Sequence, residues 1–242
     1  MAKKAALIVF GVLLLDQIVK IWVKTSFEPR DTQTLIDGFL QLHYVENPGM
    51  AFGTTFGNGM WAKLALSIFR LVAITAITLY LRKIIREGKM PVGFVIAISL
   101  VLAGAAGNLI DSMLYDYVFE FDATHPMNYV KDSEGYFIAG EGGVPVVRPQ
   151  GFLLASVVDM FQFTVKWPSW MPEGYAGTEI FGAIWNVADF AISCGVIWIL
   201  VRYRYFFKKH SNNDGGENTD VPDNSGSEPV EETPSKETPA LE

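Results

Sequence analysis

The sequence predicts an all-α membrane protein, with four transmembrane helices and a small β-rich cradle outside the membrane. Half of the 242 residues are hydrophobic and the mean hydropathy is +0.24, which is high for a soluble domain. Four apolar stretches are each long enough to cross about 30 Å of hydrocarbon, which takes about 20 helical residues. Basic residues also lie before the first stretch, between the second and third, and after the fourth. This places them all on one side of a membrane that the four helices cross in turn.

The predicted spans cover residues 5–24, 60–81, 91–110 and 184–206. Lys3 and Lys4 precede the first apolar run, so this run resembles a cleaved signal peptide at first sight. We interpret it as a retained span, because no small-residue cleavage site follows and the chain stays apolar beyond Lys20.

Lysine and arginine side chains cluster on one side of the predicted spans. They precede the first span, connect the second to the third and follow the fourth: Lys3, Lys4, Arg82, Lys83, Arg86, Lys89, Arg202, Arg204, Lys208 and Lys209. We therefore expect both termini in the cytoplasm, with the segments 25–59 and 112–183 outside. Residues 1–210 would form the membrane domain. Residues 211–242 carry nine carboxylates against one lysine, which predicts a disordered acidic tail.

The two outer segments have the patterns of folded structure. Residues 39–45 alternate apolar and polar side chains, as in a half-buried strand, and residues 152–165 form a β-branched and aromatic run. Four tryptophans fit an aromatic belt at the outer interface: Trp61, Trp167, Trp170 and Trp185.

Ionisable and amide side chains gather where the spans meet the outer surface. They are Asp16 and Lys20 in the first span, Asn108 and Asp111 at the end of the third, Asn186 and Asp189 at the start of the fourth, and Asp159 in the apolar run between them. A charged group in a span is costly and marks a functional site by default. The plain alternative is that these groups only hold the helices together.

Two neighbouring carboxyl groups can share one proton, so that one activates a water while the other protonates the scissile carbonyl. This chemistry predicts peptide-bond hydrolysis near the bilayer surface. Spacing alone does not choose which two of Asp16, Asp111, Asp159 and Asp189 react. A single cysteine and three histidines argue against a disulfide scaffold and a His-rich metal site, and a pI near 5.0 argues against nucleic-acid binding.

Three other functions fit these residues less well. A Ser/Lys peptidase needs a serine beside Lys20, and Ser156 is better explained by strand packing. An ion or proton carrier needs charges through the inner half of the spans, where Arg70 is the exception in nearly bare helices. A passive assembly factor would tolerate Asp-to-Asn changes. Three further residues are interpreted as packing or surface groups: Cys194, His43 and His125.

Five short motifs occur in order along the chain: DQIVK at 16–20, NPGMAFG at 47–53, GAAGNLID at 104–111, VVDM at 157–160 and WNVAD at 185–189. Each motif alone is a weak signal. Together, and on a scaffold of four spans, they make the sequence closely resemble the bacterial lipoprotein signal peptidases (signal peptidase II).

The resemblance implies an aspartyl endopeptidase of the bacterial inner membrane, with its active site near the outer, periplasmic face. Such an enzyme removes the signal peptide of diacylglyceryl-modified prolipoproteins, just before the lipidated cysteine. By the match, Asp159 and Asp189 are the catalytic pair. The substrate site would be lined by Asn47, Gly49, Asn108 and Asn186, with Ala51 in the same motif as Gly49, and supported by Asp16, Lys20 and Asp111. We expect no metal or cofactor, and a monomer whose partners are the precursors and membrane lipids.

Two features depart from the family pattern. The family usually has arginine directly after the third motif, where this chain has Ser112. Our hypothesis is that Arg70, in the middle of the second span, supplies the missing charge to Asp111 or Asp16. The connection from Asp111 to Asp159 is also long, and its extra residues, 115–150, form either a lid or a passive insertion; we favour the passive insertion.

Overall fold

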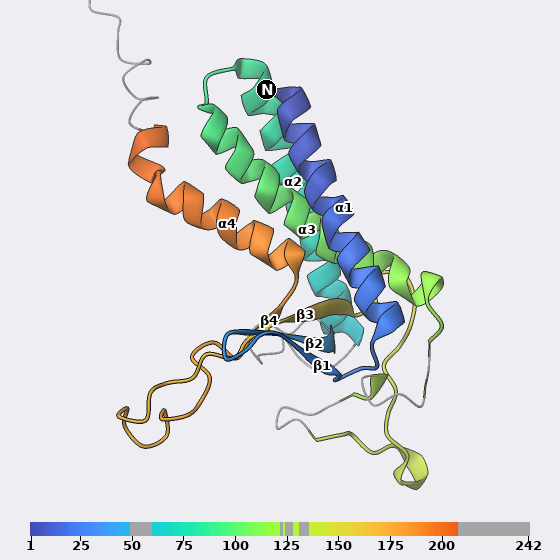
Figure 1. The fold of residues 1–242 in the computed structure, drawn as a ribbon. Coiled ribbons are helices and arrows are strands. Elements are labelled where there is room, and N and C mark those ends of the chain that lie inside the picture. Colours follow the sequence, from blue (N-terminus) through green and yellow to red (C-terminus); the bar gives the residue numbers. More distant parts are fainter. Residues whose placement is uncertain (49–59, 122, 124–127, 131–135, 208–242) are drawn as a thin grey trace, which may run out of the picture.

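A computed structural model describes residues 1–48, 60–121, 123, 128–130 and 136–207 of the chain (Figure 1). Four helices form a bundle: α1 (Ala2–Ser26), α2 (Met60–Glu87), α3 (Val92–Val118) and α4 (Val187–Val201). The predicted residues Gly49, Ala51 and His125, and the tail 211–242, lie outside the described residues.

Three of these helices, α1, α2 and α3, are long and apolar enough to cross a membrane. They coincide with the first three predicted spans; α1 and α2 extend beyond the predicted bounds, and α3 begins at Val92 and continues past residue 110 to Val118. The predicted fourth span begins too early, because Ile184 and Trp185 are extended and Asn186 caps α4. α4 ends at Val201 with Arg202 as its C-cap, and residues 203–207, which include the predicted end of the span, are again helical. Its 15 residues span only about 22 Å at 1.5 Å per residue, so α4 alone is shorter than the hydrocarbon layer.

Helix α3 lies at the centre of the bundle and packs against the other three helices (Figure 1). The predicted small face of this span explains the close approach of α4. A Cβ added at Gly104 would lie 2.2 Å from the carbonyl oxygen of Ala188, and one added at Gly195 would lie 2.6 Å from that of Ala97. Glycine therefore lets the two helices meet at backbone distance.

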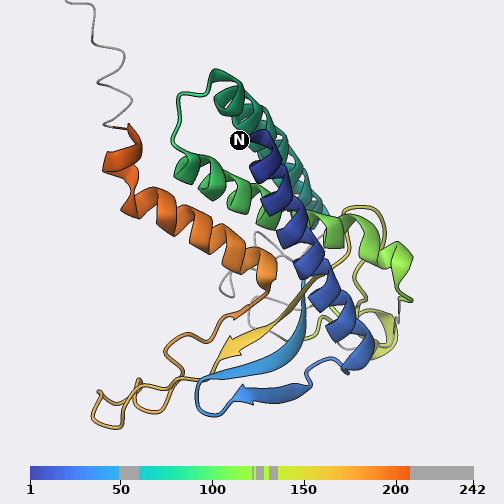
Figure 2. The same cartoon turned by 45° about the horizontal axis from the view of Figure 1, so that its top comes forward.

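A four-stranded antiparallel sheet closes one end of the bundle (Figure 2). Its order is β1 (Thr32–Ile36), β2 (Leu40–Asn47), β3 (Val157–Phe163) and β4 (Ile184–Trp185). Strand β2 confirms the strand predicted at 39–45. The predicted run 152–165 is a strand only from Val157, because the preceding residues turn and Leu153 has a positive φ of 67°. His43 is hydrogen-bonded as expected, with its Nδ1 2.8 Å from Gln162 Oε1.

The sheet lies where α1 and α3 end and where α2 and α4 begin (Figure 1). Met1 lies at the opposite end of the bundle, and α4 runs toward that end. This agrees with the predicted alternation of the helices and with outer segments that gather at one end.

The four tryptophans predicted for an aromatic belt differ in their exposure. Trp61 and Trp170 are largely exposed, at 74% and 78%. Trp185 has a different environment from an interfacial side chain, because its ring packs against those of Phe161, Phe163 and Phe190.

The long insertion is fastened to the end of α3 at its base. The Arg148 guanidinium donates two hydrogen bonds to Asp116, at 2.8 and 3.0 Å, and a third to Asn128 Oδ1 at 2.9 Å. Isolated bridges pair Tyr129 with Val147 and Ala139 with Pro145. The described part of the insertion is therefore locally folded and tied down.

Candidate active site

The two predicted catalytic carboxyls come from different elements that meet at the sheet. Asp159 lies within β3, and Asp189 lies in the first turn of α4. Strand β2 brings Asn47 alongside β3, where it pairs in register with Val157. Asn47 Nδ2 donates to Asp159 Oδ2 at 3.0 Å. The Asp159 side chain is 4% exposed, so this carboxyl sits in a largely dry environment.

Asn186 connects Asp159 to the start of α4. Its Oδ1 accepts from the backbone N–H of Asp189 at 2.9 Å, while Asp189 Oδ2 accepts from the backbone N–H of Asn186 at 3.2 Å. This reciprocal pair is a capping box, which fixes where the helix begins. Asn186 Nδ2 also donates to Asp159 Oδ1 at 2.6 Å. One residue thus caps the helix and holds the carboxyl of the neighbouring strand.

Asn108 holds the other carboxyl from α3. Its Nδ2 donates to Asp189 Oδ1 at 2.8 Å, and its Oδ1 accepts from Asn186 Nδ2 at 3.1 Å. The chain of contacts therefore runs from Asp159 through Asn186 and Asn108 to Asp189. The structure brings the predicted pair together with Asn47, Asn108 and Asn186 in one hydrogen-bonded cluster.

Lys20 lies at the centre of the predicted supporting residues and is fully buried. Its ammonium is 2.9 Å from Asp16 Oδ2 and 2.8 Å from Asp111 Oδ2. It also donates to Asn108 Oδ1 at 2.9 Å. The three donors of the ammonium therefore reach two carboxylates and one amide.

Each of these two carboxylates also holds the backbone beside one member of the pair. Asp111 Oδ2 accepts from the N–H of Val158 at 3.3 Å, immediately before Asp159. Asp16 Oδ1 accepts from the N–H of Ala188 at 2.8 Å, immediately before Asp189. Lys20 therefore links the two segments that carry the predicted catalytic residues.

The two Asn-x-x-Asp motifs look alike in the sequence but make different contacts. Asn186 and Asp189 form the capping box, whereas Asn108 and Asp111 lie along α3 and contact different partners. Asn108 faces Asp189, while Asp111 accepts from Gln17 Nε2 at 2.9 Å as well as from Lys20. Three-residue spacing places the two side chains of a motif on one helix face, but it does not determine which residues they contact.

Two members of the cluster carried no predicted role. Gln17 donates to Asp111 and to Asp16 Oδ2, at 2.9 and 3.2 Å, and accepts from the Tyr115 hydroxyl at 3.2 Å. Its position as an amide within an apolar span was the available signal. Gly107 leaves room for Asp16, since an added Cβ would lie 2.7 Å from Asp16 Oδ2.

The hypothesis for Arg70 is wrong. Lys20, on α1, holds both Asp16 and Asp111. Arg70 Nη1 instead donates to Ser112 Oγ at 3.5 Å, at the position that departs from the family pattern. The predicted rival pair of Lys20 with a serine is also not found, because the described contact of Ser156 Oγ is to Lys63 Nζ at 3.4 Å.

The environment of Asp159 favours its protonated form. Burial raises the pKa of the Asp159 carboxyl to about 7, and the charge of Asp189 acts in the same direction. The hydrogen bonds from Asn47 and Asn186 oppose this rise in pKa. One proton between two carboxyls is the condition for acid–base hydrolysis of a peptide bond.

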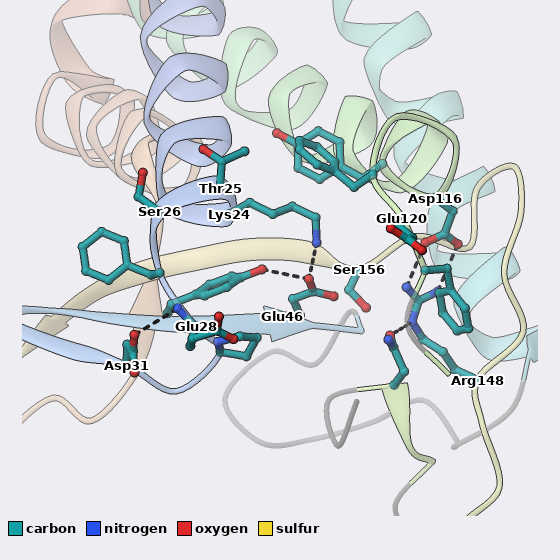
Figure 3. A pocket seen from close by; sticks show the side chains of 17 residues that line it. Lys24, Thr25, Ser26, Glu28, Asp31, Glu46, Asp116, Glu120, Arg148 and Ser156 are labelled. Carbon is teal, nitrogen blue, oxygen red and sulfur yellow. Dashed lines mark hydrogen bonds and ion pairs between the residues drawn. The ribbon is translucent and has the colours of Figure 1, made fainter. Parts of the chain in front are cut away.

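A polar cavity of about 450 Å³ lies where α1 and α3 end near β2 (Figure 3), and its lining includes neither Asp159 nor Asp189. Within it Glu46 contacts Lys24 and accepts from the Tyr44 hydroxyl at 2.9 Å. Burial alone would raise the pKa of Glu46, but Lys24 and the Tyr44 hydrogen bond lower it on balance. Consecutive side chains of a strand face opposite sides, so β2 separates Glu46 in the cavity from Asn47 at Asp159.

Among the described residues, no group of three His, Cys, Asp or Glu side chains could hold a metal ion.

The fold and the site define a class: a membrane protein of apolar helices whose paired aspartates meet at the end of the bundle beneath a small sheet. Residues 8–205 match the family model described as signal peptidase (SPase) II. The chain belongs to this family.

The similar proteins agree with this assignment. The chain is 37% identical over 204 residues to a protein named lipoprotein signal peptidase from Porphyromonas gingivalis (strain ATCC 33277), covering 82% of this chain and 81% of that protein. A protein of the same name from Amoebophilus asiaticus (strain 5a2) is 29% identical over 206 residues, covering 81% and 77%. A solved bacterial membrane enzyme, determined by the in meso method at 2.3 Å resolution, shares the fold with a TM-score of 0.52 at 22% identity, covering 89% of this chain and 94% of that one.

Proposed function

We propose that this protein is a membrane aspartyl endopeptidase that cleaves the signal peptide from diacylglyceryl-modified prolipoproteins, just before the lipidated cysteine. Membership of the signal peptidase II family supports the reaction and the substrate class. The observation that carries the catalytic assignment is the contact chain from Asp159 through Asn186 and Asn108 to Asp189.

In the proposed reaction the two aspartates act on one water molecule. Asp159 carries the shared proton, in keeping with its raised pKa, and donates it to the oxygen of the scissile carbonyl. Asp189 is the base that removes a proton from the attacking water. The tetrahedral intermediate then collapses and the C–N bond breaks. The leaving amine takes the proton that Asp189 removed from the water, and the hydroxyl that received the proton of Asp159 returns it as the carboxylic acid forms. Atoms and charge balance with water as the sole co-reactant.

The asparagines around the pair suit an extended peptide. Asn47 and Asn186 donate to Asp159, and Asn108 donates to Asp189, so each carboxyl keeps its orientation before substrate arrives. We infer that these amides also bind the peptide backbone, with Gly49 in the segment after Asn47. In the same scheme Asp16, Lys20 and Asp111 are positioning residues.

For the membrane we propose an orientation with the sheet and the active site at the outer, periplasmic face of the inner membrane and both ends of the chain in the cytoplasm. The basic residues at the far ends of the helices support it. α4 together with residues after Arg202 would make the fourth crossing. We propose a monomer, with residues 1–210 as the peptidase domain and 211–242 as an acidic cytoplasmic tail.

Purified protein in detergent, incubated with a lipidated precursor peptide and with the same peptide lacking the diacylglyceryl group, tests the reaction and the substrate class. We expect cleavage of the lipidated form alone, with mass spectrometry placing the new terminus at the modified cysteine. Chelators, thiol reagents and serine-directed acylators should leave the rate unchanged.

Loss of activity with a chelator would instead indicate a metallopeptidase. Inactivation by an acylator, or by Ser156→Ala, would indicate a serine mechanism that uses the contact between Ser156 and Lys63. Equal cleavage of both peptides would contradict the proposed substrate class.

A further inference from the structure

Helix α2 carries a polar stripe on its inner face. Lys63, Ser67 and Arg70 are three or four residues apart and so share one face of α2. Each contacts a different residue near the candidate site. Lys63 Nζ is 3.4 Å from Ser156 Oγ, and Ser67 Oγ donates to the carbonyl of Leu153 at 2.8 Å. Arg70 lies deepest along the helix and is half-buried. A guanidinium at this depth is costly and calls for a partner.

The partner of Arg70 is not a carboxylate of the described chain. Its described hydrogen bond is a long one, from Nη1 to Ser112 Oγ at 3.5 Å, and no described carboxylate lies within 4.0 Å of it. A guanidinium has five N–H donors, so Arg70 retains four for another molecule. Lys20, by contrast, has all three of its donors engaged.

The hydrogen bonds around the Arg70 guanidinium show which part of the site it lies beside. Ser112 Oγ, which accepts from Arg70, itself donates to the backbone carbonyl of Asn108 at 3.3 Å, and the Asn108 side chain donates to Asp189 at 2.8 Å. The contact with Ser112 places the group beside α3, one residue beyond Asp111. Arg70 therefore reaches, from α2, the part of α3 that carries Asn108, the residue that holds Asp189.

We propose that Arg70 is a substrate-binding residue: its free N–H groups donate to backbone carbonyl oxygens of the precursor next to the scissile bond. This inference rests on the proposed function, because it needs a peptide between the aspartates. Carbonyl oxygens suit the donors that make no described contact, and a bound peptide supplies a partner that the described residues do not offer. Ser112 is short enough to leave the space that the guanidinium occupies.

The location of the charge makes a sharp test possible. An arginine at position 112 would start on α3 beside the Arg70 guanidinium, so the same cation can be supplied from either helix. We therefore compare wild type, Arg70→Met, Arg70→Lys and the double variant Arg70→Ala/Ser112→Arg, with KM and kcat measured on the lipidated precursor. Arg86→Met is the matched control, because Arg86 is exposed near the opposite end of α2.

We expect Arg70→Met to raise KM at least tenfold, with a smaller change in kcat, and Arg70→Lys to be intermediate. The double variant should recover most of the lost affinity. Arg86→Met should match wild type. Thermal unfolding of each variant in detergent shows whether a changed KM reflects binding or a loss of the fold.

A wild-type KM in Arg70→Met would overturn the inference. So would a double variant that folds like wild type but fails to recover KM, because the cation would then serve the structure alone. If Arg70→Met does not fold, the double variant still decides, since it supplies the charge without Arg70. Wild-type protein that cleaves no precursor would refute the proposed function itself, and the inference with it.

Discussion

Lys20 is the residue through which the helices and the sheet share one polar centre. It is fully buried, and its ammonium contacts Asp16, Asp111 and Asn108. Two carboxylates and one ammonium leave the centre with an excess of negative charge that the backbone N–H groups of Val158 and Ala188 help to offset. The position of the paired aspartates depends on this centre.

Replacing Lys20 by methionine should be strongly destabilising. It leaves two buried carboxylates without their cation, and breaking such a pair from one side typically costs about 3–5 kcal/mol. Thermal unfolding in detergent measures the effect. The matched control is Lys83→Met, whose ammonium is 64% exposed and 3.9 Å from Glu87, and which should unfold like wild type. Equal stability of the two variants would contradict the central role of Lys20.

The raised pKa of Asp159 predicts how cleavage depends on pH. A carboxyl with a pKa of about 7 holds its proton below pH 7 and loses it above. If Asp159 is the acid, kcat/KM should be steady near pH 6 and lower by about tenfold at pH 8. Initial rates at low substrate concentration measure this, with unfolding followed at each pH. A flat profile from pH 6 to 9 would show that Asp159 does not deliver the proton.

For single residues, the sequence predicts which side chains belong to the polar cluster better than it predicts which contacts they make. The four-residue spacing of Asp16 and Lys20 predicts their contact, because helix geometry places such residues on one face. The place of Arg70 was predicted wrongly, because helical spacing says nothing of how α2 rotates against α3. Gln17 had no predicted role for the same reason: its partners, Asp111 and Tyr115, come from another helix.

The start of helix α4 is determined by its N-cap and not by hydropathy. The predicted span began at 184, because Ile184 and Trp185 are as apolar as the helix that follows. The structure makes them a strand, which pairs with β3 at Phe161 and Gln162. Hydropathy cannot separate a short apolar strand from the start of an apolar helix. The capping box at Asn186 is the sequence signal that marks the true boundary.

The close contact between α3 and α4 predicts the effect of a single methyl group. In Gly104→Ala the new Cβ would collide with the backbone at Ala188, one residue before Asp189. We expect a loss of about 1–3 kcal/mol of stability, together with reduced cleavage, because the helices must separate. Gly11→Ala on α1 is the control, since nothing lies within 4 Å of its added Cβ. Unchanged stability and activity of Gly104→Ala would contradict the described packing.

For the whole molecule, the basic residues predict a direction across the membrane. In a Cys194→Ala background, a cysteine at Tyr136 in the insertion should react with a membrane-impermeant maleimide added outside intact spheroplasts. A cysteine at Arg86, near the far end of α2, should react after lysis alone. Labelling in the opposite order would overturn the proposed orientation.

The sequence predicted the general architecture but not how the insertion would attach. Helices and strands follow from hydropathy and alternation, which are local, whereas the fastening of Arg148 to Asp116 joins residues 32 positions apart. The sheet was also predicted only in part. The alternating pattern of β2 predicts a strand, whereas β1 is exposed along its whole length and has no buried apolar face that a sequence pattern could reveal.

The central claim is that Asp159 and Asp189 together activate one water. Single-turnover cleavage of a lipidated precursor by Asp159→Asn and Asp189→Asn tests it most directly. Precursor binding is measured in parallel, and Asp31→Asn, at an exposed residue just before β1, is the control. We predict that each site variant binds the precursor and loses cleavage by at least about 10²–10⁴-fold, while the control cleaves like wild type. Cleavage at the wild-type rate by either site variant would contradict the account.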